Sequence, residues 1–116
     1  MPKYAALIYR VEADQPDQDS PESRRLYQAW GAFNQDVAEA GVLTSGTGLQ
    51  STATATSVRV RDGKTLITDG PFAETREQLG GILLFDCKDL DDAILWASRV
   101  PDALTGCIEL RPVWQM

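Results

Sequence analysis

The chain has 116 residues, of which 43% are hydrophobic; this is enough for a single domain with a core and excludes a disordered tail. Its formal net charge is −6, so we expect neither nucleic-acid binding nor binding to anionic membranes, because both need an excess of Lys and Arg. The sequence contains no histidine, which excludes histidine-based triads, histidine general bases and histidine metal ligands.

The sequence predicts a cytoplasmic protein. The longest apolar run, Ile82–Phe85, is far too short to cross a bilayer. Residues 1–3 lead directly into strand-like sequence instead of a charged and then apolar leader.

We expect no metal and no cofactor. Cys87 and Cys107 lack metal-ligand spacing, and each lies at or near an apolar strand, where a buried free thiol behaves as a small hydrophobe. The sequence has neither a phosphate-binding glycine loop nor a dinucleotide fingerprint.

The first part of the chain predicts a strand, a helix and a second strand. Tyr4–Tyr9 is apolar on both faces of a strand, and residues 12–19 form an acidic, aperiodic segment that predicts a mobile loop. Ser20 is the predicted N-cap of a helix that ends at Gly41, and a strand with internal glycines follows over Val42–Leu49. The apolar stripe of this helix comprises Leu26, Trp30, Phe33 and Val37.

The middle of the chain predicts a β-hairpin. Residues 56–61 alternate, so Val58 and Val60 are expected to face inward while the arginines between and after them face outward. Asp62-Gly63 is a two-residue turn signal, and residues 65–68 are the expected return strand.

The last part predicts a strand, a helix and a final strand. Residues 80–86 are apolar on both faces, Asp89 is the predicted N-cap of the second helix, Pro101 ends that helix, and residues 107–113 form the last strand. The expected buried stripe of the helix comprises Leu90, Ala93, Ile94 and Ala97, with Leu95 and Trp96 off it.

This order predicts an α+β, ferredoxin-like fold, β-α-β-(hairpin)-β-α-β, in which two βαβ units share one antiparallel sheet. The strand near the N-terminus and the strand over residues 80–86 are expected at its centre, because both are apolar on two faces. Two helices cover only one face, so we expect a second copy of the chain to cover the other and form a homodimer.

The segment from Thr68 to Gly81 is the first candidate site. Its Asp-Gly-Pro start forces a bend, and it holds four ionisable side chains, those of Asp69, Glu74, Arg76 and Glu77. Asp69 and Glu74 are the candidate catalytic proton acceptors, and Arg76 is a candidate clamp for an anionic group. The competing interpretation is structural: Asp69 holds the turn, and the other charges form local salt bridges.

Four further residues are candidate ligand-binding groups. Asp36 lies beside the apolar stripe of the first helix and either faces a pocket or the partner subunit, or is an exposed charge. Glu109 and Arg111 share one face of the last strand, where they either pair across a dimer or line a polar pocket. Tyr4 and Tyr9 face opposite ways, so we expect one in the core and the other in the cleft, and Tyr9 is the ligand-binding candidate.

Three segments together resemble the DGPF branch of YCII-related proteins: Asp69-Gly70-Pro71-Phe72 with the following residues to Gly81, the opening residues 3–9, and the ending residues 108–113. The resemblance covers nearly the whole chain and implies one YCII-related domain over residues 1–116, a dimeric α/β barrel and a bacterial setting. Relatives with such a barrel include lactone isomerases and a dechlorinating lyase. Some YCII-like proteins carry a His–Asp pair, of which only the acidic partner, Asp36, has a counterpart in this chain.

Two hypotheses of function follow. In the first, a small cytoplasmic homodimer binds a small polar or anionic molecule in a cleft by the Asp69–Glu77 loop and, if it is an enzyme, acts by proton transfer of the lyase or isomerase type. In the second, the protein is a non-catalytic interaction or regulatory module associated with transcription, because genes of the branch often lie beside alternative sigma factors.

Overall fold

The computed structural model describes residues 2–114, and its main feature is a four-stranded sheet in the order β2–β5–β1–β6 with every neighbouring pair antiparallel. This is the strand order of a ferredoxin-like α+β fold, and the two central strands are those that read as apolar on both faces. The strands of this sheet are β1 (Lys3–Arg10), β2 (Leu43–Gly48), β5 (Gln78–Asp86) and β6 (Cys107–Pro112).

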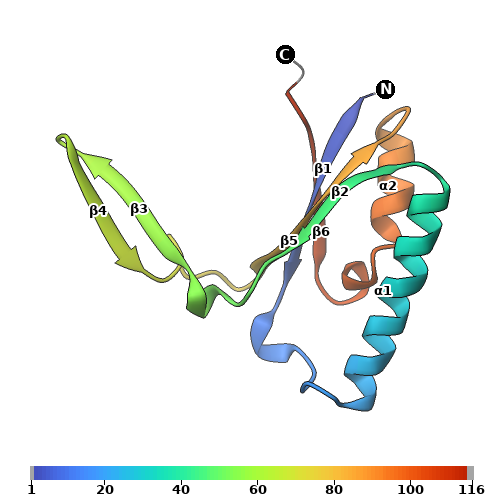
Figure 1. Ribbon diagram of the computed structural model, residues 1–116, viewed down its shortest axis with the longest axis horizontal. Coiled ribbons are helices and arrows are strands. Elements are labelled where there is room, and N and C mark those ends of the chain that lie inside the picture. The colour runs from blue at the N-terminus through green and yellow to red at the C-terminus, as the bar shows by residue number, and fades with distance from the viewer. Residues whose placement is uncertain (1, 115–116) are drawn as a thin grey trace.

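Two helices, α1 (Pro21–Glu39) and α2 (Leu90–Ser98), cover one face of the sheet (Figure 1). Each begins at the predicted cap: the Ser20 hydroxyl accepts a hydrogen bond from the Ser23 backbone N–H at 3.1 Å, and the Asp89 carboxylate accepts one from the Asp92 N–H at 2.8 Å. Such caps typically contribute about 1 kcal/mol each. The described residues also contain three short 3₁₀ turns, η1 (Glu12–Asp14), η2 (Thr52–Thr54) and η3 (Pro101–Leu104).

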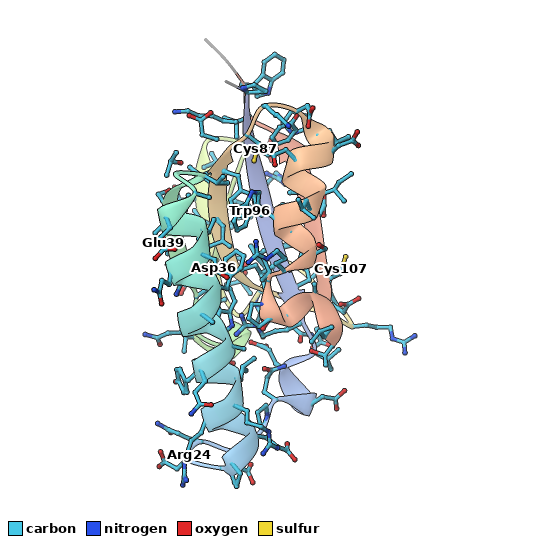
Figure 2. All side chains as sticks on the ribbon, turned by 90° about the vertical axis from the view of Figure 1, so that its right-hand side faces the viewer. Arg24, Asp36, Glu39, Cys87, Trp96 and Cys107 are labelled. Carbon is cyan, nitrogen blue, oxygen red and sulfur yellow. The ribbon has the colours of Figure 1, made fainter. Side chains whose placement is uncertain are left out.

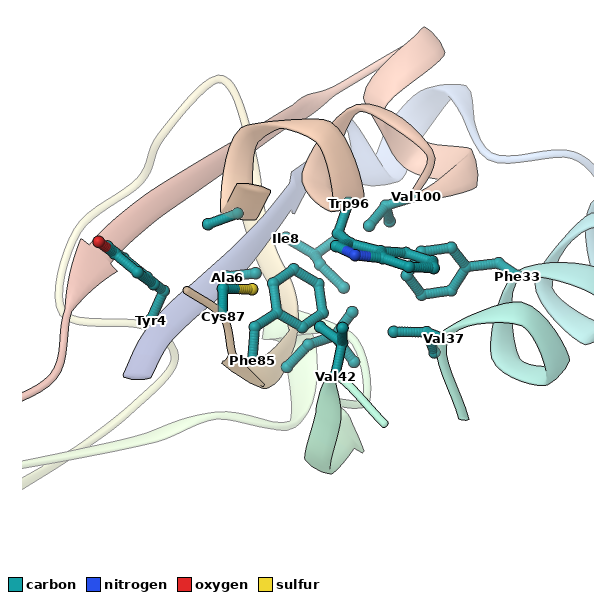
Figure 3. Close-up of a cluster of buried hydrophobic side chains, with 12 residues drawn as sticks. Tyr4, Ala6, Ile8, Phe33, Val37, Val42, Phe85, Cys87, Trp96 and Val100 are labelled. Atoms are coloured by element: carbon teal, nitrogen blue, oxygen red, sulfur yellow. The ribbon is translucent and has the colours of Figure 1, made fainter. Parts of the chain in front are cut away.

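The core lies between the sheet and the two helices (Figure 3). The stripe predicted for α1 is confirmed, since Phe33 and Val37 are buried and Trp30 packs against the cluster. The rings form an edge-to-face series in which Phe33 lies 5.8 Å from Trp30 and 6.5 Å from Trp96 between centroids. The buried side chains from the strands include Tyr4, Ala6, Ile8, Leu83 and Phe85.

The predicted stripe of α2 is partly wrong. Ala93 and Ala97 are buried as expected, but Leu90 and Ile94 are each 49% exposed and Trp96 is only 9% exposed. The helix presents Ala93, Trp96 and Ala97 to the core because the indole fills the space beside Phe33, and a large ring buries more apolar area there than a leucine.

The hairpin of β3 (Thr56–Arg61) and β4 (Lys64–Asp69) forms a separate two-stranded sheet that stands away from the rest of the chain (Figure 1). Its predicted turn is confirmed, but the expectation that Val58 and Val60 face inward is wrong, because they are 62% and 60% exposed. Alternation determines which side chains share a face; it does not determine whether anything covers that face.

The cysteines differ in their surroundings (Figure 2). Cys87 is buried as predicted, and burial raises the pKa of its thiol to about 11. Cys107 is exposed, which corrects the expectation that both thiols are buried, because it starts the edge strand β6 on the face away from the helices.

No helix within residues 2–114 is long and apolar enough to span a bilayer. The described residues also contain no group of three or more His, Cys, Asp or Glu side chains that could hold a metal ion.

Candidate functional site

A cleft of about 990 Å³ lies beside the loop that leads from the hairpin to β5. One wall is residues 70–75 and 77–79, a second is η2 with the start of β3, and Tyr9 at the end of β1 also lines the cleft. The hydroxyl, amide and carboxylate side chains that line it are Tyr9, Glu12, Ser51, Thr52, Thr56, Ser57, Glu74, Thr75, Glu77 and Gln78.

Glu12 joins the walls of this cleft. Its carboxylate accepts a hydrogen bond from the Thr52 backbone N–H at 2.9 Å and one from the Thr52 hydroxyl at 2.5 Å. Its own backbone N–H donates to Gln78 Oε1 at 2.9 Å. The pKa of Glu12 is lowered, first by the Thr52 hydroxyl and then by the Thr52 backbone N–H, because both stabilise the ionised carboxylate.

The loop itself is folded by short-range hydrogen bonds. The Gln78 amide donates to the carbonyl of Thr75 at 2.5 Å, and the Thr75 hydroxyl donates to the carbonyl of Glu77 at 2.6 Å. Through Glu12 and Gln78 this loop is therefore connected to η2 on the far side of the cleft.

The bend at the start of the loop is formed by the backbone conformation of Gly70 and by the hydrogen bonds of its backbone groups. Gly70 has φ of 105°, a conformation that only glycine adopts readily, and its N–H donates to the carbonyl of Ala55 at 2.7 Å. The Ser57 hydroxyl donates to the carbonyl of Gly70 at 2.8 Å. These bonds fasten the bend to the base of the hairpin, and none of them uses the carboxylate of Asp69.

The structure brings only some of the predicted site residues to the cleft. Tyr9 and Glu74 line it, whereas Asp69 lies directly before the bend and outside the lining. Arg76 lines a neighbouring pocket of about 510 Å³ together with Asp14 and Glu77. Asp69 and Glu74 are both exposed to solvent.

Glu109 and Arg111 lie on the face of the sheet that the helices leave uncovered, opposite Leu7 and Ala5 of β1. They pair with each other, Arg111 Nε to Glu109 Oε2 at 2.5 Å, and the carboxylate raises the pKa of Arg111. The two charges therefore neutralise each other within one strand of a single chain.

Asp36 lies in the helical layer (Figure 2). It accepts a hydrogen bond from Arg99 Nη2 at 2.7 Å, which ties α1 to the end of α2, and the Arg99 guanidinium also stacks on the ring of Trp96 at 4.5 Å. Both members of the pair are about half exposed, so the pair itself contributes little to stability.

Glu12 lies in residues 12–19, for which the sequence predicts a mobile acidic loop, and no sequence pattern marks it as a site residue. The available signal was its position: a carboxylate two residues after a strand is held near the end of the sheet by the strand itself. Its partner Thr52 is 40 residues away in the sequence, which is why no local pattern indicated the contact.

Fold and cleft define a ferredoxin-like α+β protein with an open, carboxylate-lined cleft at one end of its sheet. A family model of the YCII-related domain matches residues 2–116. An uncharacterised protein of Rhizobium meliloti (strain 1021) is 38% identical over 112 residues, which cover 95% of this chain and 90% of that relative. The chain belongs to the YCII-related family.

Proposed function

We propose that the protein is a cytoplasmic bacterial homodimer, one domain per chain, that binds a small polar molecule in the cleft beside the loop of residues 70–79. The cleft, with Glu74 and Tyr9 in its lining, is the observation that carries the proposal. Its volume lies within the usual range for small-molecule sites, roughly 300–1,000 Å³.

Two uncovered surfaces support the dimer. The sheet face opposite the helices carries Ala5, Leu7, Ile82 and Leu84, all of them only half-buried in the single chain. The hairpin has almost no cover, and an isolated two-stranded hairpin is marginally stable in water. A second copy of the chain on this side buries both surfaces.

The charges of the cleft restrict the class of ligand that it can bind. Three carboxylates, of Glu12, Glu74 and Glu77, are among its lining residues, and no Lys or Arg is found there in the described part of the chain. Like charges repel, so this lining favours a neutral polar or cationic molecule over the anionic alternative. Arg76 and Arg111 have carboxylates beside them, in Glu77 and Glu109 respectively, which weakens their role as anion clamps.

If the protein is an enzyme that acts by proton transfer, Glu74 is the proposed proton acceptor. Its side chain makes no hydrogen bond to another described residue, so both carboxylate oxygens are free to accept from a ligand. The Tyr9 hydroxyl lines the same cleft and supplies a donor. Asp69, just before the bend, is the second proton acceptor in this proposal and requires the loop to turn toward the ligand.

The test is a thermal-shift screen of small amines, polyols and sugars, followed by calorimetric titration of any compound that raises the melting temperature, since a ligand specific for the native state stabilises it. We expect Glu74→Gln and Tyr9→Phe each to weaken binding by about tenfold, which corresponds to the loss of one good hydrogen bond. Glu39→Gln, a matched change at the end of α1, should leave the affinity unchanged. Equal affinity for wild type, Glu74→Gln and Tyr9→Phe would remove the cleft as the binding site.

A second candidate function is the interaction or regulatory module, and the exposed apolar hairpin is the observation that favours it. Hydrogen exchange of the purified protein separates the two candidates. Slow exchange across residues 56–69 supports burial of the hairpin in the homodimer, whereas fast exchange in a stable dimer leaves the hairpin free for another protein.

A further inference from the structure

A second pocket, of about 550 Å³, lies on the helix-covered side of the sheet, between α1 and the ends of β2 and β5. It has no carboxylate among its lining residues, and its one charged group is the guanidinium of Arg10. Its remaining lining is aromatic, aliphatic or glycine, with the amide of Asn34 and the hydroxyl of Thr47. Its chemistry is therefore opposite to that of the acidic cleft.

Glycines create the space in this pocket. A Cβ on Gly80 would lie 2.7 Å from Arg10 Nε, and a Cβ on Gly46 would lie 2.9 Å from a methyl group of Leu83, so side chains at either position would displace their neighbours. A Cβ on Gly48, by contrast, would meet no atom within 4 Å. Gly48 therefore borders open volume that a side chain could fill.

Arg10, which lines this pocket, has one hydrogen-bond donor without a partner among the described residues. Its Nη2 pairs with Asp102 Oδ2 at 2.7 Å, and Asp102 is 4% exposed. Its Nε is buried and has no hydrogen-bond partner within residues 2–114. A buried N–H without an acceptor is unfavourable, and an oxygen atom of a ligand would satisfy it. Because Asp102 already balances the charge of Arg10, that oxygen does not have to be ionised.

Two aromatic side chains, Trp30 and Tyr27, line this pocket. Trp30 lines the pocket and is held by the edge-to-face contact with Phe33, with an interplanar angle of 87°. Tyr27 lies one turn earlier on α1, 74% exposed, at the mouth of the pocket. A ring bound between these side chains and the flat glycine backbone of β2 and β5 would contact aromatic or backbone atoms on both faces.

We propose that this pocket binds a flat aromatic molecule carrying an oxygen acceptor, a carboxylate or carbonyl, which accepts a hydrogen bond from Arg10 Nε while the ring packs against Trp30. A carboxylate and a carbonyl group both accept a hydrogen bond in this way, but only the carboxylate is charged. The site is separate from the acidic cleft and does not depend on the function proposed for it.

The experiment is calorimetric titration of the full chain with 2-naphthoate, 2-naphthamide and cyclohexanecarboxylate. We expect both naphthyl compounds to bind and the non-planar acid to bind at least about tenfold more weakly, because a saturated ring cannot stack. Stronger binding of the naphthoate identifies an aromatic acid as the class, and equal binding identifies an aromatic carbonyl compound.

Two variants test the location. Gly48→Leu places a side chain at the edge of the pocket, where a Cβ meets no atom within 4 Å. Arg10→Lys keeps a positive charge for Asp102 but removes the Nε donor. Each variant should weaken the binding of 2-naphthoate by about tenfold or more. Gly31→Ala, on the same helix as Trp30 but outside the pocket, should not change the affinity. Circular dichroism verifies that each variant is folded. If Arg10→Lys does not fold, Gly48→Leu still tests the location of the site.

Absence of naphthyl binding at millimolar concentration, or unchanged binding by folded Gly48→Leu, would overturn the proposal. A Gly48→Leu protein that becomes monomeric in light scattering while wild type binds neither naphthyl compound would also overturn it, because the groove would then be a contact between copies of the chain.

Discussion

At the scale of single residues, Glu12 has the most consequential environment. It lies where β1 ends, and its carboxylate binds both the backbone and the hydroxyl of Thr52, so one side chain connects the sheet to the far wall of the cleft. An ionised carboxylate suits this position better than a neutral one, because both partners are donors.

Glu12→Gln should lower the free energy of unfolding by about 1 kcal/mol at pH 7, the usual net value of one hydrogen bond, because Glu12 is only partly buried. Because the folded-state pKa of Glu12 is below its usual 4.5, the stabilisation is present above that value and is lost as the pH falls through the folded-state pKa. Urea unfolding of both proteins at pH 7 and at pH 3 measures this, and the difference between them should shrink at the lower pH. A difference that grows on acidification would contradict the assignment.

Cys87 should be unreactive while the protein is folded. Burial raises the pKa of its thiol to about 11, so almost no thiolate is present at pH 8. In a Cys107→Ser variant, which removes the exposed thiol, Ellman's reagent should react only as fast as the protein unfolds and should react at once in denaturant. Rapid labelling of the folded variant would show that the site opens locally.

At the scale of secondary structure, local signals were reliable because their causes are local. The caps at Ser20 and Asp89, the stop at Gly41 and the turn at Asp62-Gly63 each lie where the sequence indicated them, since each depends on backbone groups within a few residues. The buried side of α2 was less predictable. Trp96 faces the core because it packs against Phe33 of the other helix, and that contact is not local in the sequence.

Gly31→Ala is a test of α1. Gly31 lies inside the helix with nothing within 4 Å of the position of a Cβ, so alanine fits without contact and the higher helix propensity is the main effect. We expect a gain of about 0.5–1 kcal/mol in the free energy of unfolding. Thermal and urea denaturation measure it. A loss of stability would mean that this side of α1 packs against something absent from the single chain.

At the scale of the whole molecule, the hairpin is the feature that one chain cannot explain. One face carries Val58, Val60 and Ile67, and the other carries Arg59, Arg61 and Lys64 together with Leu66. An apolar face of this kind is typical of a surface buried by a partner, and our proposal is that the partner is a second copy.

Ile67→Lys should convert the proposed dimer to a monomer, because it places two charges in one symmetric interface. Ile67 is 68% exposed in the single chain, so the change should not unfold it. Thr68→Lys places the same charge on the next residue, on the opposite face, and should have a much weaker effect. Multi-angle light scattering distinguishes a particle of 12.7 kDa from one of twice that mass. A wild-type protein of 12.7 kDa at micromolar concentration would rule out the dimer.

The sequence by itself determined the element order, the strands at the centre of the sheet, the helix caps and the bend at Gly70, because periodicity, capping and glycine conformation are written in neighbouring residues. It also indicated that the segment around Glu74 would line a cleft. The tertiary structure alone decided which charges meet: Asp36 with Arg99, Arg10 with Asp102, and Glu12 with Thr52. Each of these pairs joins residues at least 40 positions apart, and contacts at that separation depend on how whole elements pack, which no local pattern of residues contains.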